Sequence, residues 1–199
     1  FVAYCARVSN PGNQNNSKTA AGLLKYLIKN DHWSPFEMVS ITMEIQTTRD
    51  ISHQIVRHRS FSYQEFSQRY AVSDTFQTRE ARLQDPKNRQ NSIELDKGLA
   101  EDKMLSEMWN MKQTEALRKN REIYEWALQQ GIAKEQARTV LPEGLTGTTL
   151  YMAGTLRSWI HYCQLRMANG TQKEHQQIAE LCWDIIGTHF PSVIKAYEG

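Results

Sequence analysis

The sequence predicts a domain that combines helices with a β-sheet, and three periodic segments carry this prediction. Apolar and polar residues alternate from Val39 to Gln46, which is the period of a half-buried strand. Apolar residues recur every three or four positions from Ala20 to Ile28, which predicts a helix that ends near Asn30. The third segment, residues 97–130, contains no proline and keeps the same helical spacing over a much greater length. The sequence therefore predicts both types of regular structure in one chain.

The other elements follow from local signals. Residues 97–130 predict one helix, or two with a kink near Gly98 or Asn110, and its methionines and tryptophans are expected in the core. Residues 133–141 predict a short helix stopped by Pro142, and residues 148–154 predict a strand. Residues 156–166 and 175–189 predict two further helices, the second stopped by Pro191. The side chains expected to face inward on these two helices are Leu156, Ile160, Cys163, Ile178, Leu181, Cys182, Ile185 and Ile186.

Composition limits the classes of protein that the chain can belong to. A chain of 199 residues with 40% hydrophobic content fits a single domain, residues 1–199, that can bury a core. The net charge of +2, from 24 basic and 22 acidic residues, argues against non-specific binding of nucleic acid or a membrane. Any anion-binding site must therefore be local.

Cysteine usage and the chain start give two further expectations. Cys5, Cys163 and Cys182 are odd in number and widely spaced, which predicts reduced thiols and a cytoplasmic location. No apolar run approaches the roughly 20 residues of a membrane helix, and no secretory leader opens the chain. The chain begins with an apolar Phe1 instead of Met, so we expect an N-terminal strand to have been truncated.

The segment from Arg57 to Tyr70 concentrates the chemistry of the chain in fourteen positions. Residues 51–59 predict a short helix whose last turn is Arg57 to Arg59, and the aromatic residues after Ser60 predict an extended run. In extended chain, Glu65, Ser67 and Arg69 would share one face and offer an acceptor, a hydroxyl and a forked donor. This combination suits a sugar phosphate. A solvated helix end followed by an edge strand would also explain the composition.

Four motifs with characteristic residues occur in this chain. The first is Arg57-His58-Arg59, seven residues, then Ser67 and Arg69, and the second is His32-Trp33-Ser34-Pro35-Phe36-Glu37 before a strand. The third is Ala137-Arg138-Thr139-Val140-Leu141-Pro142, and the fourth is Arg157-Ser158, Leu165-Arg166, Gln172 and Glu174. All four resemble the motifs of one enzyme family, the flavin-dependent thymidylate synthases (the ThyX family). The family often has Asn at the positions of Thr155 and His161, and His at that of Gly170. The resemblance therefore spans residues 32–174.

The resemblance implies a fold, a reaction and an assembly. The fold would be α+β, with a mixed sheet flanked by long helices. The reaction would be reductive methylation of dUMP to dTMP, with methylenetetrahydrofolate as carbon donor and FAD reduced by NADPH as hydride source. The assembly would be a homotetramer with sites shared between subunits.

The resemblance also implies a role for each site residue. Arg166 would be catalytic, because its guanidinium stays protonated and can stabilise negative charge on the uracil. The residues that would bind dUMP are Gln54, Arg57, Glu65, Phe66, Ser67, Gln68, Arg69, Arg138 and Arg166. The residues that would bind FAD are His32, Ser34, Arg57, His58, Arg59, Glu65, Thr155, Leu156, Arg157 and His161. On a regular helix Arg157 and His161 share a face, whereas Arg166 lies about 180° from Arg157.

Three alternatives were weighed against this interpretation. A zinc site through His32, His53 and His58 is disfavoured, because no cysteine or carboxylate pair completes a tetrahedral set. Arginines beside Phe61 and Tyr63 could bind single-stranded nucleic acid, but the balanced net charge provides little non-specific affinity. An unrelated flavin oxidoreductase would share the cofactor and differ in the substrate.

Overall fold

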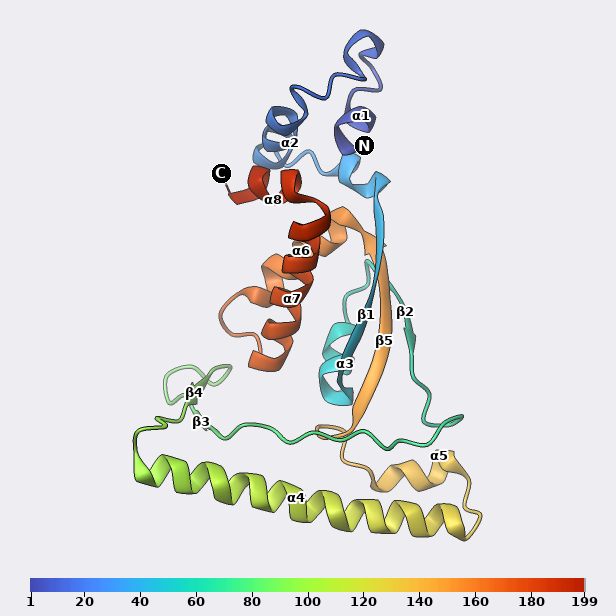
Figure 1. The fold of residues 1–199 in the computed structure, drawn as a ribbon, viewed down its shortest axis with the longest axis vertical. Coiled ribbons are helices and arrows are strands. Elements are labelled where there is room, and N and C mark those ends of the chain that lie inside the picture. Colours follow the sequence, from blue (N-terminus) through green and yellow to red (C-terminus); the bar gives the residue numbers. More distant parts are fainter. Residues whose placement is uncertain (199) are drawn as a thin grey trace.

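The computed structural model describes residues 1–198 and has an α+β architecture, as the sequence predicts (Figure 1). Three strands form the central sheet in the order β1, β5, β2. Every pairing in this sheet is antiparallel, so the expectation of a mixed sheet is wrong for the described residues. The strands are β1 (Ser40–Thr48), β5 (Gly147–Thr155) and β2 (Ser62–Glu65), and a separate pair is β3 (Arg82–Gln84) with β4 (Ser92–Glu94).

The alternation predicted for residues 39–46 sets the register of the sheet. Met43 lies opposite Met152 and Ile45 lies opposite Leu150, so the apolar positions of β1 and β5 coincide on one face. All four side chains are buried. Burial of these facing apolar pairs stabilises the long β1–β5 ladder, which carries the site residues at both of its ends.

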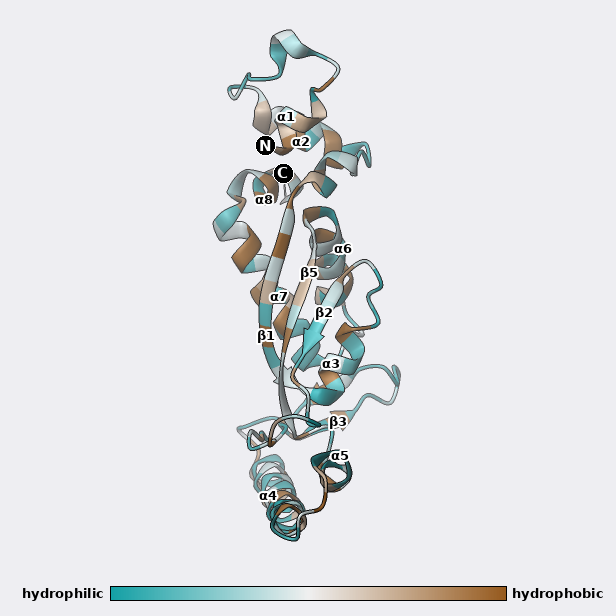
Figure 2. Cartoon of the chain, turned by 90° about the vertical axis from the view of Figure 1, so that its right-hand side faces the viewer, coloured by the Kyte–Doolittle hydropathy of each residue, from teal (hydrophilic) through white to brown (hydrophobic). Residues whose placement is uncertain are grey.

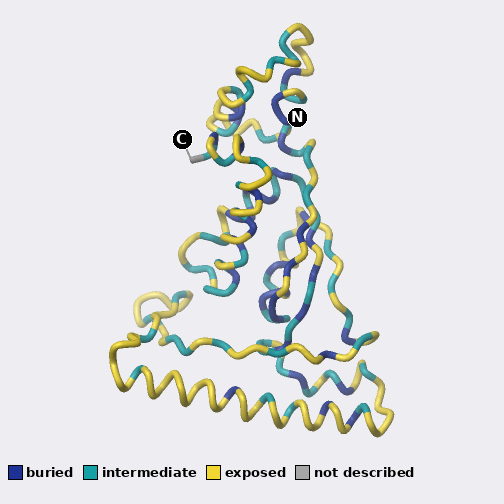
Figure 3. Tube along the Cα trace, viewed as in Figure 1, coloured by how far each residue is buried: buried dark blue, intermediate teal, exposed yellow. Residues whose placement is uncertain are grey.

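The main core lies between this sheet and the helices that follow β5, as the dark blue segments in Figure 3 show. Trp159 is fully buried, and its Nε1 donates a hydrogen bond to the carbonyl oxygen of Ile41 at 3.1 Å. The inward positions predicted for the helix at residues 156–166 are confirmed. In the helix predicted at residues 175–189, however, Leu181 and Ile185 are 62% and 45% exposed. Only one side of α7 packs within the described residues, because that side faces α6, α8 and α3. The helices and short 3₁₀ turns of this body are α1 (Val2–Ala6), η1 (Pro11–Asn13), α2 (Ala20–Lys29), η2 (Ser34–Met38), α3 (Arg49–Ile55), α6 (Leu156–Met167), α7 (Lys173–His189) and α8 (Pro191–Glu198).

A single 30-residue helix, α4 (Ala100–Gln129), runs across one end of the molecule without a kink (Figure 1). It is followed by α5 (Lys134–Ala137) and η3 (Arg138–Val140). The C-terminal part of α4 packs against α5 and η3 around the buried Tyr124 and Ala127, and in its middle the buried Gln113 hydrogen-bonds to the backbone of Arg79. The expectation that its methionines and tryptophans are core residues is wrong, because these side chains are 44% to 61% exposed. Figure 2 shows α4 as mostly hydrophilic, with scattered apolar residues. Its exposed apolar residues include Met104, Leu105, Met108, Trp109, Met111 and Trp126.

Two further expectations concern the chain start and membranes. The strand expected before Phe1 lies outside the described residues, which begin with α1. Among residues 1–198, no helix combines the length and apolar content that crossing a membrane requires. In the same range, no group of three or more His, Cys, Asp or Glu side chains is arranged to hold a metal ion.

Candidate functional site

The Arg-His-Arg segment lies in a turn instead of in a helix. Helix α3 ends at Ile55, so the expectation that Arg57 to Arg59 form its last turn is wrong. The hydroxyl of Tyr63 donates to the carbonyl oxygen of His58 at 2.7 Å and lies 3.0 Å from that of Ile55, which also accepts from the amide of His58. Burial raises the pKa of Tyr63 to about 12, so this donor keeps its proton. The turn exposes Arg57 and Arg59 and holds only His58 inward.

His58 fixes the side chain of Arg166. The Nε of Arg166 donates a hydrogen bond to the Nε2 of His58 at 2.8 Å. Nε2 must therefore be the unprotonated nitrogen, and the neutral imidazole carries its proton on Nδ1. Burial, followed by the charge of Arg166, lowers the pKa of His58 to about 4, which keeps this tautomer neutral. Among the described residues Arg166 forms no ion pair, so its positive charge is held in place without being neutralised.

A chain of hydrogen bonds behind this pair fixes the amide of Gln54. His175 is fully buried, with Nε2 3.1 Å from the hydroxyl of Tyr162 and Nδ1 3.3 Å from Oε1 of Gln54. The Nε2 of Gln54 donates to Oε1 of Gln172 at 2.8 Å, and Gln172 donates to Glu174 at 2.9 Å. Every donor in this chain can therefore point toward the carboxylate of Glu174. In that arrangement Nδ1 of His175 is protonated and donates, and its Nε2 accepts from the hydroxyl of Tyr162. Burial, then the charge of the nearby Arg166, lowers the pKa of His175 to about 3, so this arrangement persists at neutral pH.

Sequence reasoning missed His175 and Tyr162, because each was assigned no role beyond its place on a helix. A signal for His175 was present: it follows Gln172 and Glu174, which belong to the fourth motif. On α7, a histidine at an inward position must find polar partners, and the structure provides two.

The segment from Glu65 to Arg69 is a strand end followed by a turn. Strand β2 ends at Glu65, and the amides of Tyr70 and Ala71 both donate to the carbonyl oxygen of Ser67 at 3.1 Å. The expectation that Glu65, Ser67 and Arg69 line one extended face is therefore wrong. Arg69 instead pairs with Glu135 of α5 at 3.0 Å, which places it next to η3 and Arg138.

Two residues of the predicted set use their side chains inside the protein. Gln68 is only 3% exposed and donates to the hydroxyl of Ser73 at 2.9 Å. Leu156 is fully buried in the core, and its amide donates to the carbonyl oxygen of Val39 at 2.8 Å. In this conformation neither side chain can contact a ligand, so both predictions fail for the side chains. Phe66, by contrast, is 37% exposed.

Other groups of this segment form a local network. The Oε1 of Glu65 accepts a hydrogen bond from the hydroxyl of Thr148 at 2.9 Å and lies 3.5 Å from Nη1 of Arg49. The hydroxyl of Ser67 is 3.4 Å from the amide nitrogen of Arg69. No base is within hydrogen-bonding distance of this hydroxyl among residues 1–198, so the geometry gives Ser67 no means of activation as a nucleophile.

Part of the set predicted to bind FAD lies at the start of α6. Thr155 is the N-cap of this helix and accepts a hydrogen bond from the amide of Ser158 at 3.3 Å. Arg157 forms an ion pair with Glu37 of η2. The ring of His161 lies edge-on to Trp33 with centroids 4.6 Å apart, and burial, then the charge of Arg157, lowers the pKa of His161.

His32 and Ser34 belong to the same region and are exposed on the turn that leads into β1. Helix α6 is 12 residues long, so its positive end beside Arg157 suits a pyrophosphate. The residues present therefore fit the phosphates of a dinucleotide cofactor such as FAD.

The chain thus holds its candidate site residues in three separate groups. The first contains Gln54, His58 and Arg166, the second runs from Glu65 to Arg69, and the third surrounds the start of α6. Within residues 1–198, no hydrogen bond or ion pair connects members of different groups.

Comparisons with known proteins agree over almost the whole chain. The family model described as "Thymidylate synthase complementing protein" (Thy1) matches residues 1–192. The probable flavin-dependent thymidylate synthase of Paramecium bursaria Chlorella virus 1 is 51% identical over 199 residues, which are 100% of this chain and 89% of that protein. The flavin-dependent thymidylate synthase of Synechocystis sp. is 49% identical over 198 residues, covering 100% of this chain and 88% of the relative.

A solved structure agrees with these sequence relatives. The UMP/dUMP methylase PolB from Streptomyces cacaoi, bound with 5-Br dUMP, superimposes with a TM-score of 0.85 at 28% identity, over 99% of this chain and 88% of that one. Together the matches define a flavin-dependent methyltransferase of nucleotide biosynthesis. The chain belongs to the flavin-dependent thymidylate synthases, the family that its four motifs resemble, and its cofactor is FAD.

Proposed function

We propose that this chain catalyses the reductive methylation of dUMP to dTMP, with methylenetetrahydrofolate as carbon donor and FAD reduced by NADPH as hydride source. Membership of the family supports the reaction, and the 5-Br dUMP-bound structure of PolB supports a uracil nucleotide as the substrate. The observation that carries the proposal for the site is the Arg166–His58 pair, which holds a charged guanidinium beside a neutral imidazole.

In this proposal, Arg166 stabilises the negative charge that develops on the uracil. A donor held in place before the reaction costs no reorganisation when the charge appears. Because no carboxylate neutralises Arg166 among the described residues, its field is available to the substrate. Gln54 is presented next to it, with Oε1 held by His175 and Nε2 held by Gln172, so one N–H and one lone pair remain for the nucleotide.

The other groups bind the remaining parts of the ligands. Arg57, Arg69 and Arg138 are forked donors that suit the nucleotide phosphate, and Ser67 contributes a hydroxyl without acting as a nucleophile. FAD supplies the hydride chemistry when it is bound. Thr155, Arg157 and the start of α6 bind its phosphates, and His32, Ser34, His58, Arg59 and His161 are the other residues that we assign to the flavin.

Conversion of dUMP to dTMP by the FAD-loaded protein, with methylenetetrahydrofolate and NADPH present, tests this proposal. Arg166→Ala should lower the rate roughly 30-fold to 1,000-fold, since loss of one such donor costs about 2 to 4 kcal/mol. Arg118→Ala is the matched control, because Arg118 is exposed on α4 and pairs only with Glu122. Ser67→Ala should weaken dUMP binding and keep turnover. Flavin oxidation without dTMP, or a dUMP adduct on Ser67, would contradict the assignment.

We also propose that the working form is a homotetramer with sites shared between chains. The exposed apolar residues of α4 support this, because a contact between chains would bury them. Met104 and Met108 are one helical turn apart, and Trp126 lies 18 positions, or five whole turns, beyond Met108. All three are exposed by 51% to 61% on the side turned away from the buried Tyr124. Apolar side chains arranged along one face are typical of a surface that another chain covers.

Mixing of two inactive variants tests the shared site. Arg69→Ala and Arg166→Ala should each be nearly inactive as pure proteins. If the two arginines that serve one nucleotide come from different chains, a mixed oligomer regains sites in which both are intact. Mixed oligomers confirmed by native mass spectrometry, yet no more active than the single variants, would refute sharing by this pair. Met108→Glu should shift the mass measured by light scattering toward smaller species.

A further inference from the structure

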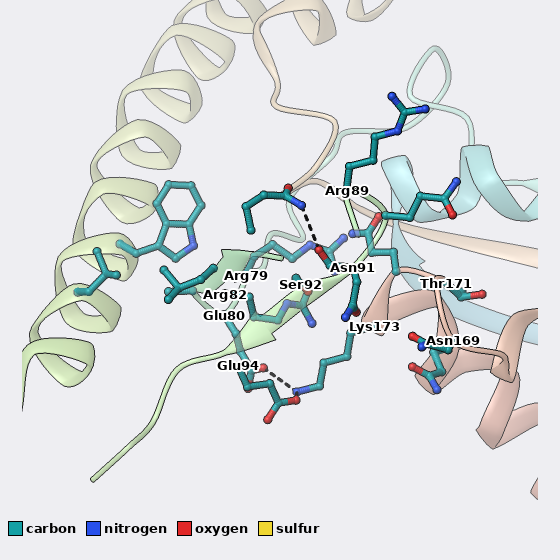
Figure 4. A pocket seen from close by; sticks show the side chains of 18 residues that line it. Arg79, Glu80, Arg82, Arg89, Asn91, Ser92, Glu94, Asn169, Thr171 and Lys173 are labelled. Carbon is teal, nitrogen blue, oxygen red and sulfur yellow. Dashed lines mark hydrogen bonds and ion pairs between the residues drawn. The ribbon is translucent and has the colours of Figure 1, made fainter. Parts of the chain in front are cut away.

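A cavity of about 900 Å³ lies outside all three groups of predicted site residues. It opens between the β3–β4 pair, the N-terminal end of α7 and the side of α4 (Figure 4). Its volume is in the range of sites that bind small organic molecules. None of the residues assigned above to dUMP or FAD lines it.

Two arginines, held in place by ion pairs, form the floor of the cavity. Arg79 and Arg82 are only 16% and 12% exposed in their side chains, and both contact Glu174. Arg79 also pairs with Asp50 at 2.9 Å. The Nη1 of Arg82 is buried without a hydrogen-bond partner among the described residues. Two guanidiniums are thus fixed in position, and one retains an unsatisfied donor that an acceptor in the cavity would stabilise.

The rim carries two cations of different kinds. Lys173, in the first turn of the 17-residue helix α7, pairs with Glu80 at 3.2 Å and with Glu94. Arg89 is exposed and forms no ion pair within residues 1–198. Figure 4 shows Arg79, Arg82 and Lys173 close together, whereas the side chain of Arg89, which also lines the cavity, extends away from them. Arg89 is therefore the cation most available to a ligand.

The opposite wall is apolar. Leu105 and Trp109 are one turn apart on α4, line the cavity and are 43% and 44% exposed. An indole at such a wall offers a flat surface to an aromatic ring. The cavity therefore combines a place for a ring with places for anionic groups.

The cavity adjoins the candidate nucleotide site. Gln172 lines it and also accepts the hydrogen bond from Gln54. Gln172 therefore lies between a ligand in the cavity and Gln54, whose amide is proposed to bind dUMP. A co-substrate that reacts with that nucleotide could extend from one space into the other.

We propose that this cavity binds the aromatic, carboxylate-bearing arm of the folate co-substrate, the aminobenzoyl-glutamate part of the molecule. The benzoyl ring lies against Trp109, and the glutamate carboxylates pair with Arg89 and with the α7 end near Lys173. Four cations line the cavity, and among the described residues carboxylates pair with all of them except Arg89. One unpaired cation suits a carboxylate better than a dense polyphosphate. The inference rests on the proposed function, because it assumes folate as the carbon donor.

Direct binding tests the assignment. Calorimetric titration of the FAD-loaded protein, with dUMP present, should detect p-aminobenzoylglutamate, and Arg89→Ala should weaken this binding about tenfold. Trp109→Ala should weaken it by a similar factor through the ring, which keeps the test informative if one variant folds poorly. Arg118→Ala, on the same helix and outside the cavity, should bind like the unchanged protein. Adenosine 2′,5′-bisphosphate is the second probe, because its phosphates offer the alternative anion on an aromatic molecule.

The outcomes separate this inference from the proposed function. In steady-state assays, Arg89→Ala should raise the KM for methylenetetrahydrofolate about tenfold and leave the KM for dUMP unchanged. If the unchanged protein makes dTMP but p-aminobenzoylglutamate does not bind, or binds equally to Arg89→Ala, the cavity is not the site of the folate arm. Binding of the bisphosphate alone, weakened by Arg89→Ala, would also overturn the proposal and assign the cavity to a phosphate ligand. A protein that binds p-aminobenzoylglutamate through Arg89 but makes no dTMP would support the cavity and refute the reaction.

Discussion

His175 should make the stability of this protein fall in mild acid. It is fully buried, and its pKa is lowered to about 3, first by burial and then by the charge of Arg166. The unfolded chain binds a proton at this histidine below its ordinary pKa of about 6.5, whereas the folded chain does not until far lower pH. The folded state is therefore favoured above pH 6.5, and this contribution is lost progressively as the pH falls toward 3.

The magnitude follows from the proton uptake. Between pH 6.5 and pH 5, the unfolded state binds nearly one extra proton at His175, which lowers the free energy of unfolding by about 1.5 kcal/mol. His58, with a pKa of about 4, adds a contribution of the same sign, reduced because this ring is only partly buried. The window from pH 5 to 6.5 lies above the usual titration of carboxylates, so it isolates the histidines.

Substitution of His175 by Gln isolates the contribution of this one residue. A glutamine can still accept from Tyr162 and donate to Gln54, but it does not titrate. Urea unfolding, followed by circular dichroism at one protein concentration, gives the free energy of unfolding of both proteins at pH 6.5, 6.0, 5.5 and 5.0. The advantage of the unchanged protein over His175→Gln should shrink by about 1.5 kcal/mol across this range.

An exposed histidine on the same helix provides the control for this test. His189→Gln removes an exposed histidine from the end of the same helix and reports the effect of losing a surface imidazole. If the difference between the unchanged protein and His175→Gln stays constant from pH 6.5 to 5.0, His175 is not held neutral, and the direction of the hydrogen bonds inferred from it is wrong.

Two further predictions concern packing and thiol reactivity. Gly154→Ala should lower the free energy of unfolding, measured in urea, by about 1 to 3 kcal/mol, because the new Cβ would lie 2.4 Å from the buried ring of Phe61. Gly22→Ala on α2 is the matched control: nothing lies within 4 Å of its Cβ, so it should be neutral or stabilising by up to about 1 kcal/mol. Equal losses for the two alanine variants would show that the close approach in β5 has no cost. A maleimide should modify Cys5 in the folded protein and spare Cys163 and Cys182, since burial raises the pKa of Cys182 to about 12 and raises that of Cys163 further. Mass spectrometry should count one adduct before denaturation and three after it, and rapid labelling of all three would refute this prediction.

Much of the fold could be predicted from the local spacing of apolar and polar residues. The alternation of residues 39–46 predicted β1 because only one face of that strand is buried, and the same face sets the register with β5. The predicted helix at residues 156–166 is confirmed together with its inward positions, because both of its flanks pack against the sheet and α7. The α4 expectation was right for the element and wrong for its burial. An apolar residue on a helix indicates that some surface covers it, and the pattern does not say whether that surface belongs to the same chain.

The family and its motifs could also be identified from the sequence, because chemistry that binds a given ligand requires particular residue types at particular spacings. The family membership is confirmed by the comparisons, whereas the roles of the individual site residues remain predictions. The partners of those residues could not be predicted. Nothing local indicates that Arg166 lies against His58, 108 positions earlier, or that His175 reaches Gln54 across 121 positions.

The sequence by itself determined most of the secondary structure, the class of fold and the family of this protein, since each depends on spacings of a few residues along the chain. Only the tertiary structure decided which side chains are available. In the structure, Gln68 and Leu156 are buried in the interior, α3 ends before Arg57, and a cavity lies beside Gln172. The physical reason is that burial and hydrogen-bond partners are properties of long-range packing, and a residue's neighbours in space are set by elements far away in the sequence.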